Sequence, residues 1–143
     1  MSQSKISTDD STTVAALRKM VLNFVSERDW QQFHSPKNLS MAMAIEAGEL
    51  MEHFQWIDGA ESRNPAAEKL VDIGEELADV LCYAMAIANE LNIDIASTMA
   101  RKMERNREKY PAQEFRGRYG KDCLLYTSPS PRDQRGSRMP SSA

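Results

Sequence analysis

The chain has very little cysteine, histidine or glycine. Among its 143 residues are two cysteines and two histidines, which excludes a disulfide framework and a thiolate metal cluster. No apolar run reaches transmembrane length, and the sequence up to Thr13 is polar rather than an apolar leader. A glycine-rich phosphate loop, an alternating strand pattern and an internal repeat are also missing from the sequence. We therefore expect an all-α protein that is soluble and cytoplasmic.

The two ends of the chain differ in composition from its middle. Residues 123–143 are rich in Ser, Pro, Gly and Arg and have no helical period. The run from Cys123 to Asp133 also corresponds to the in-frame translation of a sequencing adapter. We interpret 123–143 as disordered adapter read-through, and we expect 112–122 to be a C-terminal extension and 1–13 to be a flexible N-terminus.

The remaining chain of about 120 residues is mildly acidic. Without the tail it has 15 basic and 20 acidic residues, a net charge of −5. Such a balance provides no electrostatic attraction for nucleic acid and no polybasic face for a membrane, so we expect neither partner. A domain of this size has a limited capacity to bury a core alone, and oligomerisation would increase it.

Apolar residues recur at three- and four-residue intervals in four segments, as in amphipathic helices. The second helix has Asn38 or Ser40 as a candidate N-cap, and the fourth has Asp94. The third helix is apolar nearly all round over residues 80–88, and we expect this half to be buried, between subunits. The four helices are predicted at residues 14–28, 38–54, 65–91 and 94–107.

Two pairs of acidic residues in these helices are the strongest indication of function. Glu46 and Glu49 lie in the second predicted helix, and Glu76 and Asp79 lie in the third, each pair among apolar neighbours. Residues three apart share one face of a helix, so antiparallel packing of the two helices would bring all four carboxylates together. Buried carboxylates need compensation, and oxygen ligands favour a hard cation such as Mg²⁺ or Mn²⁺.

Each of these features also has a simpler structural interpretation. A single pair of acids is usually a solvated helix face, and aromatic residues such as Trp30 and Trp56 are more often core than ligand platform. A di-iron site of the ferritin type is disfavoured, because His34 and His53 do not follow a glutamate at the spacing that this design uses. The two interpretations stay open on the spacing alone.

Four runs of the sequence together resemble a known family, the MazG-like all-α nucleotide pyrophosphohydrolases, and within it the dCTP pyrophosphatase branch. The similarity extends over nearly all of 14–111, which we take as one MazG-like domain. It implies a bundle of four to five helices in which the second and third carry the acidic metal motifs. The four runs that carry it are residues 27–39, 46–56, 75–83 and 102–111.

The resemblance also implies an activity. Family members use Mg²⁺ to cleave a nucleoside triphosphate between its α and β phosphates, which gives a monophosphate and pyrophosphate. For this branch the implied substrate is dCTP or a related nucleotide, and the implied role is sanitation of the nucleotide pool. A homodimer or homotetramer, in which neighbouring chains complete the substrate pocket, is implied as well.

The family's functional residues can be carried over by position. The resemblance assigns Glu46, Glu49, Glu76 and Asp79 as metal ligands. One carboxylate of this group can also orient or deprotonate the attacking water, and we assign this catalytic role to Glu49, with Glu46 as the other candidate. Some animal members have a histidine at the position of Val21. The implied substrate-binding residues are Trp30, His34, Asn38, Trp56, Tyr83, Lys102, Asn106, Arg107 and Tyr110.

Two other functions remain possible from the sequence. The same metal site would serve an enzyme that prefers dUTP or one that hydrolyses many nucleotides, with the aromatic residues selecting another base. A non-enzymatic helical oligomer could instead use the acids to hold a structural ion. Turnover of different nucleotides separates the first two, and metal binding without any nucleotide effect would indicate the third.

Overall fold

The computed structural model describes residues 7–117, and every regular element among them is a helix, which confirms the all-α prediction. Residues 1–6 and the segment 123–143, which we interpreted from the sequence as adapter read-through, lie outside this range. The chain divides into two compact units, with the boundary after Thr98. Within the described part, no helix combines the length and the apolar character needed to cross a membrane.

The first unit begins with α1, Val14–Ser26, which ends two residues before the predicted limit. The hydroxyl of Thr13 accepts a hydrogen bond from the Ala16 N–H at 3.1 Å and so caps the helix. After α1, a short 3₁₀ helix, η1, spans Gln31–Phe33. It lies in the segment between the first two predicted helices.

The helix α2, Pro36–Glu52, starts earlier than predicted. Its N-cap is Ser35, whose hydroxyl accepts from the Asn38 N–H at 3.2 Å, so the prediction of Asn38 or Ser40 as the cap was wrong. The reason is Pro36, which occupies the first turn, where its missing N–H costs nothing and its fixed φ suits a helix. A second 3₁₀ helix, η2, Glu61–Arg63, follows in the polar connection.

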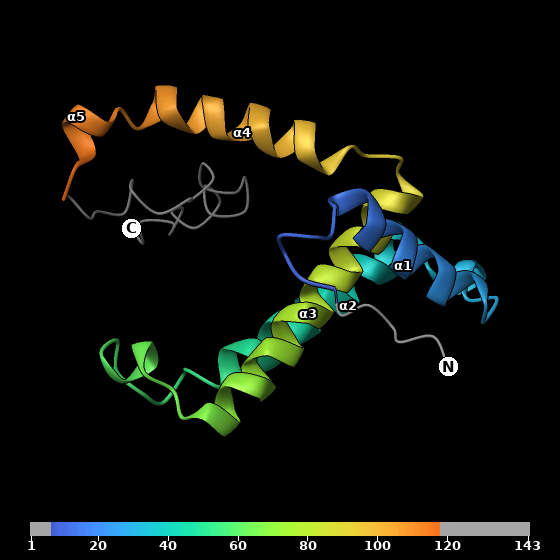
Figure 1. Cartoon of the computed structure of the whole chain (residues 1–143), viewed down its shortest axis with the longest axis horizontal. Coiled ribbons are helices and arrows are strands. Elements are labelled where there is room, and N and C mark those ends of the chain that lie inside the picture. The colour runs from blue at the N-terminus through green and yellow to red at the C-terminus, as the bar shows by residue number, and fades with distance from the viewer. Residues whose placement is uncertain (1–6, 118–143) are drawn as a thin grey trace, which may run out of the picture. The chain divides into compact units, whose positions relative to one another are not determined.

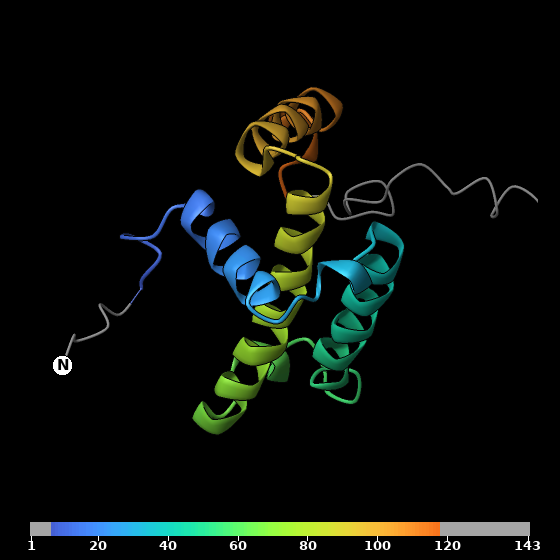
Figure 2. The same ribbon diagram turned by 90° about the vertical axis from the view of Figure 1, so that its right-hand side faces the viewer.

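The longest helix, α3, Ala67–Glu90, is the central element of this unit. It packs against both α2 and α1. Figure 2 shows α2 and α3 running antiparallel, with α1 against the C-terminal half of α3. The expected antiparallel packing of the two acidic helices is therefore present.

Both α1 and α3 end in the same left-handed turn. Asp29, with φ of 52°, follows α1, and Asn92, with φ of 54°, follows α3. In each case the next N–H returns to a carbonyl five residues earlier, from Trp30 to Val25 at 3.1 Å and from Ile93 to Ala88 at 2.9 Å. This is the Schellman arrangement, in which glycine is the usual left-handed residue. It fixes the direction in which Trp30 leaves α1.

The first unit has a small core. Among the described residues the buried apolar side chains are Val25, Leu39, Ala86 and Ala88. Large apolar side chains elsewhere stay open, with Ile45 and Val71 each 61% exposed. Residues 80–88 were expected to be buried between subunits; within the single chain Ala86 and Ala88 are buried and Leu81 is half exposed.

The fourth helix, α4, Ile95–Lys109, begins as predicted after Asp94, whose carboxylate accepts from the Ser97 N–H at 2.8 Å. The unit boundary falls within α4. In the second unit, α4 is followed by α5, Ala112–Phe115. The rings of Tyr110 and Phe115 meet edge to face there, with centroids 5.4 Å apart. Figure 1 labels the α-helices of the described residues.

We expect Asn92 to be more tolerant of glycine than of a β-branched residue. Glycine adopts a positive φ without a steric penalty, whereas Asn92→Val should lower the free energy of unfolding by about 1–2 kcal/mol. Urea denaturation of the two variants measures this difference. A glycine variant less stable than the valine variant would contradict the left-handed assignment.

Candidate active site

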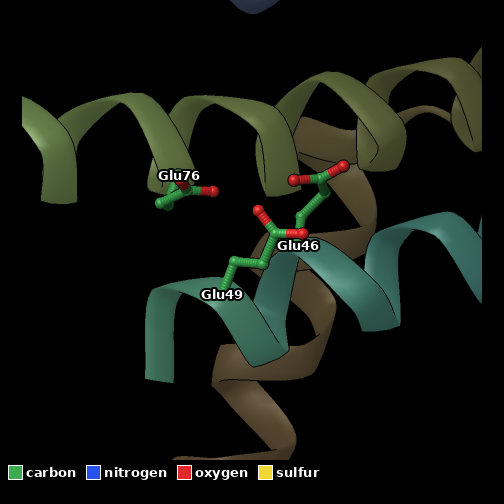
Figure 3. A group of neighbouring side chains, drawn as sticks. All are labelled: Glu46, Glu49 and Glu76. Carbon is green, nitrogen blue, oxygen red and sulfur yellow. The ribbon is translucent and has the colours of Figure 1, made fainter. Parts of the chain in front are cut away.

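Three glutamates from two helices form the candidate active site. Glu46 and Glu49 are on α2 and Glu76 is on α3, and one carboxylate oxygen of each lies within 4.8 Å of the others. Figure 3 shows the three side chains in the space between the two helices. The three-residue spacing places both α2 glutamates on one face, and α3 lies opposite that face. The structure therefore brings together three of the four predicted carboxylates.

The electrostatics of this cluster favour a cation or a bound proton. The pKa of Glu46 is raised, first by partial desolvation and then by the charges of Glu49, Asp79 and Glu76. Protonation of Glu46 is consequently easier in the folded protein than in the unfolded chain. This carboxyl favours folding below its ordinary pKa, and that contribution is lost as the pH rises through its raised pKa.

One oxygen in the cluster has no partner. Glu76 Oε2 is buried and makes no hydrogen bond in the structure. A buried acceptor without a donor costs free energy, and a cation at this point would satisfy it. Three carboxylates of this kind are an all-oxygen donor set, which fits Mg²⁺ or Mn²⁺.

The fourth predicted ligand, Asp79, is one helical turn beyond Glu76 on α3. It lies outside the three-carboxylate group but close enough to raise the pKa of Glu46. Both Asp79 and Glu46 also line a cavity of about 450 Å³ next to the cluster. Asp79 therefore connects the acidic cluster to that cavity.

The cavity has an apolar wall from α1 and a mixed wall from α3. It contains three of the predicted substrate-binding residues, Trp30, His34 and Tyr83. It also contains Val21. The other residues that line it, which the sequence did not single out as site residues, are Met20, Phe24, Val25, Cys82 and Ala86.

The loop between α1 and α2 positions the aromatic part of the cavity. The ring of Trp30 meets Phe24 edge to face at 5.8 Å, and its centroid is 6.4 Å from that of His34. Asn38 Nδ2 donates to the Phe33 carbonyl at 3.0 Å. The amide nitrogen of Asn38, a predicted substrate ligand, is thus engaged in holding this loop.

Two further cavity residues keep their protons to higher pH than usual. Partial burial raises the pKa of the Cys82 thiol, and the charge of Asp79 raises it further. Desolvation likewise raises the pKa of Tyr83, with smaller contributions from Glu46, Asp79 and Cys82. A neutral phenol and a neutral thiol therefore face the cavity at neutral pH.

The other predicted residues lie elsewhere, and their roles stay predictions. Trp56 follows α2 in a turn, is 87% exposed and does not line the cavity. In the second unit, Arg107 pairs with Glu104 at 2.7 Å. The residues of that unit predicted to bind substrate are Lys102, Asn106, Arg107 and Tyr110.

The α1 wall is the part of the site that sequence reasoning missed. Met20, Phe24 and Val25 belong to the three- and four-residue spacing of an ordinary core stripe. Phe24 is nevertheless 49% exposed and Met20 is 55% exposed. Nothing in the spacing distinguishes a stripe that faces a cavity from one that faces a filled core.

Comparisons with known proteins agree on one family. The model of the MazG-like family matches residues 41–121, a range that contains the three clustered glutamates. Rat dCTP pyrophosphatase 1 is 40% identical over 107 residues, which are 73% of this chain and 63% of the relative. The human protein of the same name is 39% identical over 102 residues, 70% of this chain and 60% of the relative. The chain thus spans less than two thirds of the length of these relatives.

A solved structure gives an independent comparison. The crystal structure of a pyrophosphatase from Archaeoglobus fulgidus superposes with a TM-score of 0.61 at 33% identity. The match covers 75% of this chain and 99% of the archaeal one. Sequence and structure agree, and the chain belongs to the MazG-like family.

Proposed function

We propose that this protein is a metal-dependent nucleoside triphosphate pyrophosphohydrolase that converts dCTP to dCMP and pyrophosphate and so serves nucleotide-pool sanitation. The observation that carries the proposal is the cluster of Glu46, Glu49 and Glu76 beside an aromatic cavity. The names of the curated relatives and of the archaeal neighbour support the same chemistry. We place the reaction in the cytoplasm.

The donor set fits a hard divalent ion. Glu46, Glu49, Glu76 and Asp79 would hold Mg²⁺, or Mn²⁺ in its place, and the buried Glu76 Oε2 would gain a partner. When bound, such an ion neutralises charge on the triphosphate and lowers the pKa of a coordinated water.

The residues of the chain then have distinct tasks. Hydrolysis adds a water oxygen to one phosphorus of the α–β anhydride and breaks the bridging P–O bond, so that pyrophosphate leaves. Glu49 is exposed within the cluster and would accept the proton of that water at a carboxylate oxygen, with Glu46 as the other candidate. Most of the remaining task is orientation of the phosphates, since phosphoryl transfer needs little covalent help.

The cavity is suited to the base of the nucleotide. Trp30 offers a ring for stacking, and the polar groups of His34 and Tyr83 line the same space. A volume of about 450 Å³ admits a base and part of its sugar. We retain Asn38 and Trp56 as candidates, together with the second-unit residues Lys102, Asn106, Arg107 and Tyr110. A preference for dUTP, or for no particular base, is the alternative that the same site permits.

Association of identical chains would cover apolar side chains that a single chain leaves exposed. Ile45 and Val71 are open apolar side chains on the two acidic helices. A second copy of the chain would cover such surface, and we propose a homodimer or homotetramer. Sedimentation equilibrium measures the subunit number.

The acidic cluster gives the first prediction about activity. Glu76→Gln should lower kcat by at least about 100-fold because a metal ligand is lost. In EDTA the same variant should melt at a higher temperature than the parent, because one of three mutually repelling charges is gone. Addition of Mg²⁺ should then stabilise it less than it stabilises the parent.

The matched control is Glu75→Gln, which removes the same charge one residue earlier on α3 but outside the cluster. It should keep near-normal turnover and the full stabilisation by Mg²⁺. Glu49→Gln should keep the fold and lose turnover, and near-normal activity in that variant would refute its role as proton acceptor. Stabilisation by Mg²⁺ without hydrolysis of any nucleotide would instead favour a structural ion.

The aromatic cavity gives the second prediction. Trp30→Ala should raise KM for dCTP at least about fivefold, because stacking on a base contributes about 1–3 kcal/mol. Pyrophosphate release across dCTP, dUTP, dATP, dGTP, dTTP and CTP measures the preference. The control is Phe33→Ala, an exposed aromatic of the same loop that does not line the cavity. If the parent hydrolyses all of these nucleotides equally fast, the proposed pyrophosphohydrolase reaction stands but the proposed preference for dCTP is refuted.

Cys82 reports occupancy of the cavity. In a Cys123→Ser background, alkylation by iodoacetamide should accelerate with pH around a midpoint above that of a free thiol, because burial and Asp79 raise the Cys82 pKa. Saturating nucleotide with Mg²⁺ should slow alkylation, since the thiol lines the cavity. Mass spectrometry follows the reaction. If a nucleotide is hydrolysed but does not change the rate of Cys82 alkylation, its base binds outside the cavity.

A further inference from the structure

A reciprocal set of hydrogen bonds connects α1 to the C-terminal end of α3. Arg18 Nε donates to Asn89 Oδ1 at 3.0 Å, and an Arg18 Nη donates to the Ala88 carbonyl at 3.1 Å. In return, Asn89 Nδ2 donates to the Arg18 carbonyl at 3.0 Å. We call these three bonds the Arg18–Asn89 clasp. All three are partly buried, so water competes with them less than on the open surface.

The clasp lies next to the cavity along both helices. On α1, Met20 and Val21 follow Arg18 within one turn, and both line the cavity. On α3, Ala86 lies three residues before Asn89 and lines the opposite wall. Rotation or sliding of α1 on α3 at the clasp would therefore change the width of the cavity.

The buried side chains on the two helices are all apolar. Within the described part of the chain, Val25 is the buried apolar residue of α1, and Ala86 and Ala88 are those of α3. These side chains are small, and packing between apolar groups does not require a defined orientation of the two helices. The clasp supplies the directional contacts, because its amide, guanidinium and carbonyl groups require a defined orientation.

We propose that Arg18 and Asn89 are positioning residues for base recognition, which hold α1 at the distance from α3 that gives the cavity its size. This rests on the proposed function, since the cavity is taken as the base pocket. Neither residue lines the cavity. They act through the α1 wall, and the acidic cluster on α2 and α3 does not depend on them.

The test compares kinetics on a pyrimidine and a purine nucleotide. Asn89→Leu keeps a similar volume and removes all hydrogen bonding by the side chain. We expect KM for dCTP to rise about tenfold with kcat changed less than about threefold, and the preference for dCTP over dATP to fall. Asn89→Asp, which keeps the acceptor for Arg18, should retain most of the preference.

Two controls separate positioning from general loss of stability. Lys19→Ala, at the exposed neighbour of Arg18 on α1, should leave KM and selectivity unchanged. In the double variant Arg18→Lys, Asn89→Leu the loss should be smaller than the sum of the losses in the two single variants, because the two side chains share hydrogen bonds. A variant that loses activity equally towards both nucleotides, with an unchanged preference, would show a structural role only and would overturn the proposal.

A second readout does not depend on catalysis. The chain has two tryptophans, so in a Trp56→Phe background Trp30 alone reports on the cavity. Acrylamide should quench Trp30 more strongly in Asn89→Leu than in the same background without it. If both the quenching of Trp30 and the preference for dCTP over dATP are unchanged, the positioning role of the Arg18–Asn89 clasp is refuted. Failure of the parent to release pyrophosphate from any nucleotide would refute the proposed function, while the quenching result would still test the clasp.

Discussion

Mutual repulsion of the carboxylates between α2 and α3 is the constraint on which the rest of the structure depends. Glu46, Glu49 and Glu76 bring three negative charges within 4.8 Å. A proton or a cation stabilises such a group, and desolvation, followed by the charges of Glu49, Asp79 and Glu76, raises the pKa of Glu46. Any cation bound here would contribute its binding free energy to folding as well as to chemistry.

The central position of α3 explains how one short domain can combine two kinds of site. Its contact with α2 contains the acidic cluster, and its contact with α1 contains the cavity. Asp79 lies between the two sites, because it lines the cavity and its charge raises the pKa of Glu46. A nucleotide whose base entered the cavity would thus have its phosphates directed towards the carboxylates without any long loop to connect the two regions.

Properties that depend on local periodicity were predictable from the sequence. The helices and the placement of Glu46 and Glu76 on facing surfaces follow from three- and four-residue spacing and from antiparallel packing. The left-handed turns at Asp29 and Asn92 were not predicted, because neither residue is the glycine that usually marks such a turn. The α1 wall of the cavity was missed for a different reason. A helix face that lines a cavity has the same apolar sequence pattern as one that packs in the core.

The small core limits what a single chain can do alone. Four buried apolar side chains in the described residues provide little hydrophobic free energy against the conformational entropy of about 100 ordered residues. Burial of open side chains such as Ile45 and Val71 by a second copy would add to it. Repulsion within the acidic cluster destabilises the fold until a cation is bound. Association and metal binding should therefore reinforce one another, because each stabilises the α2–α3 arrangement that the other requires.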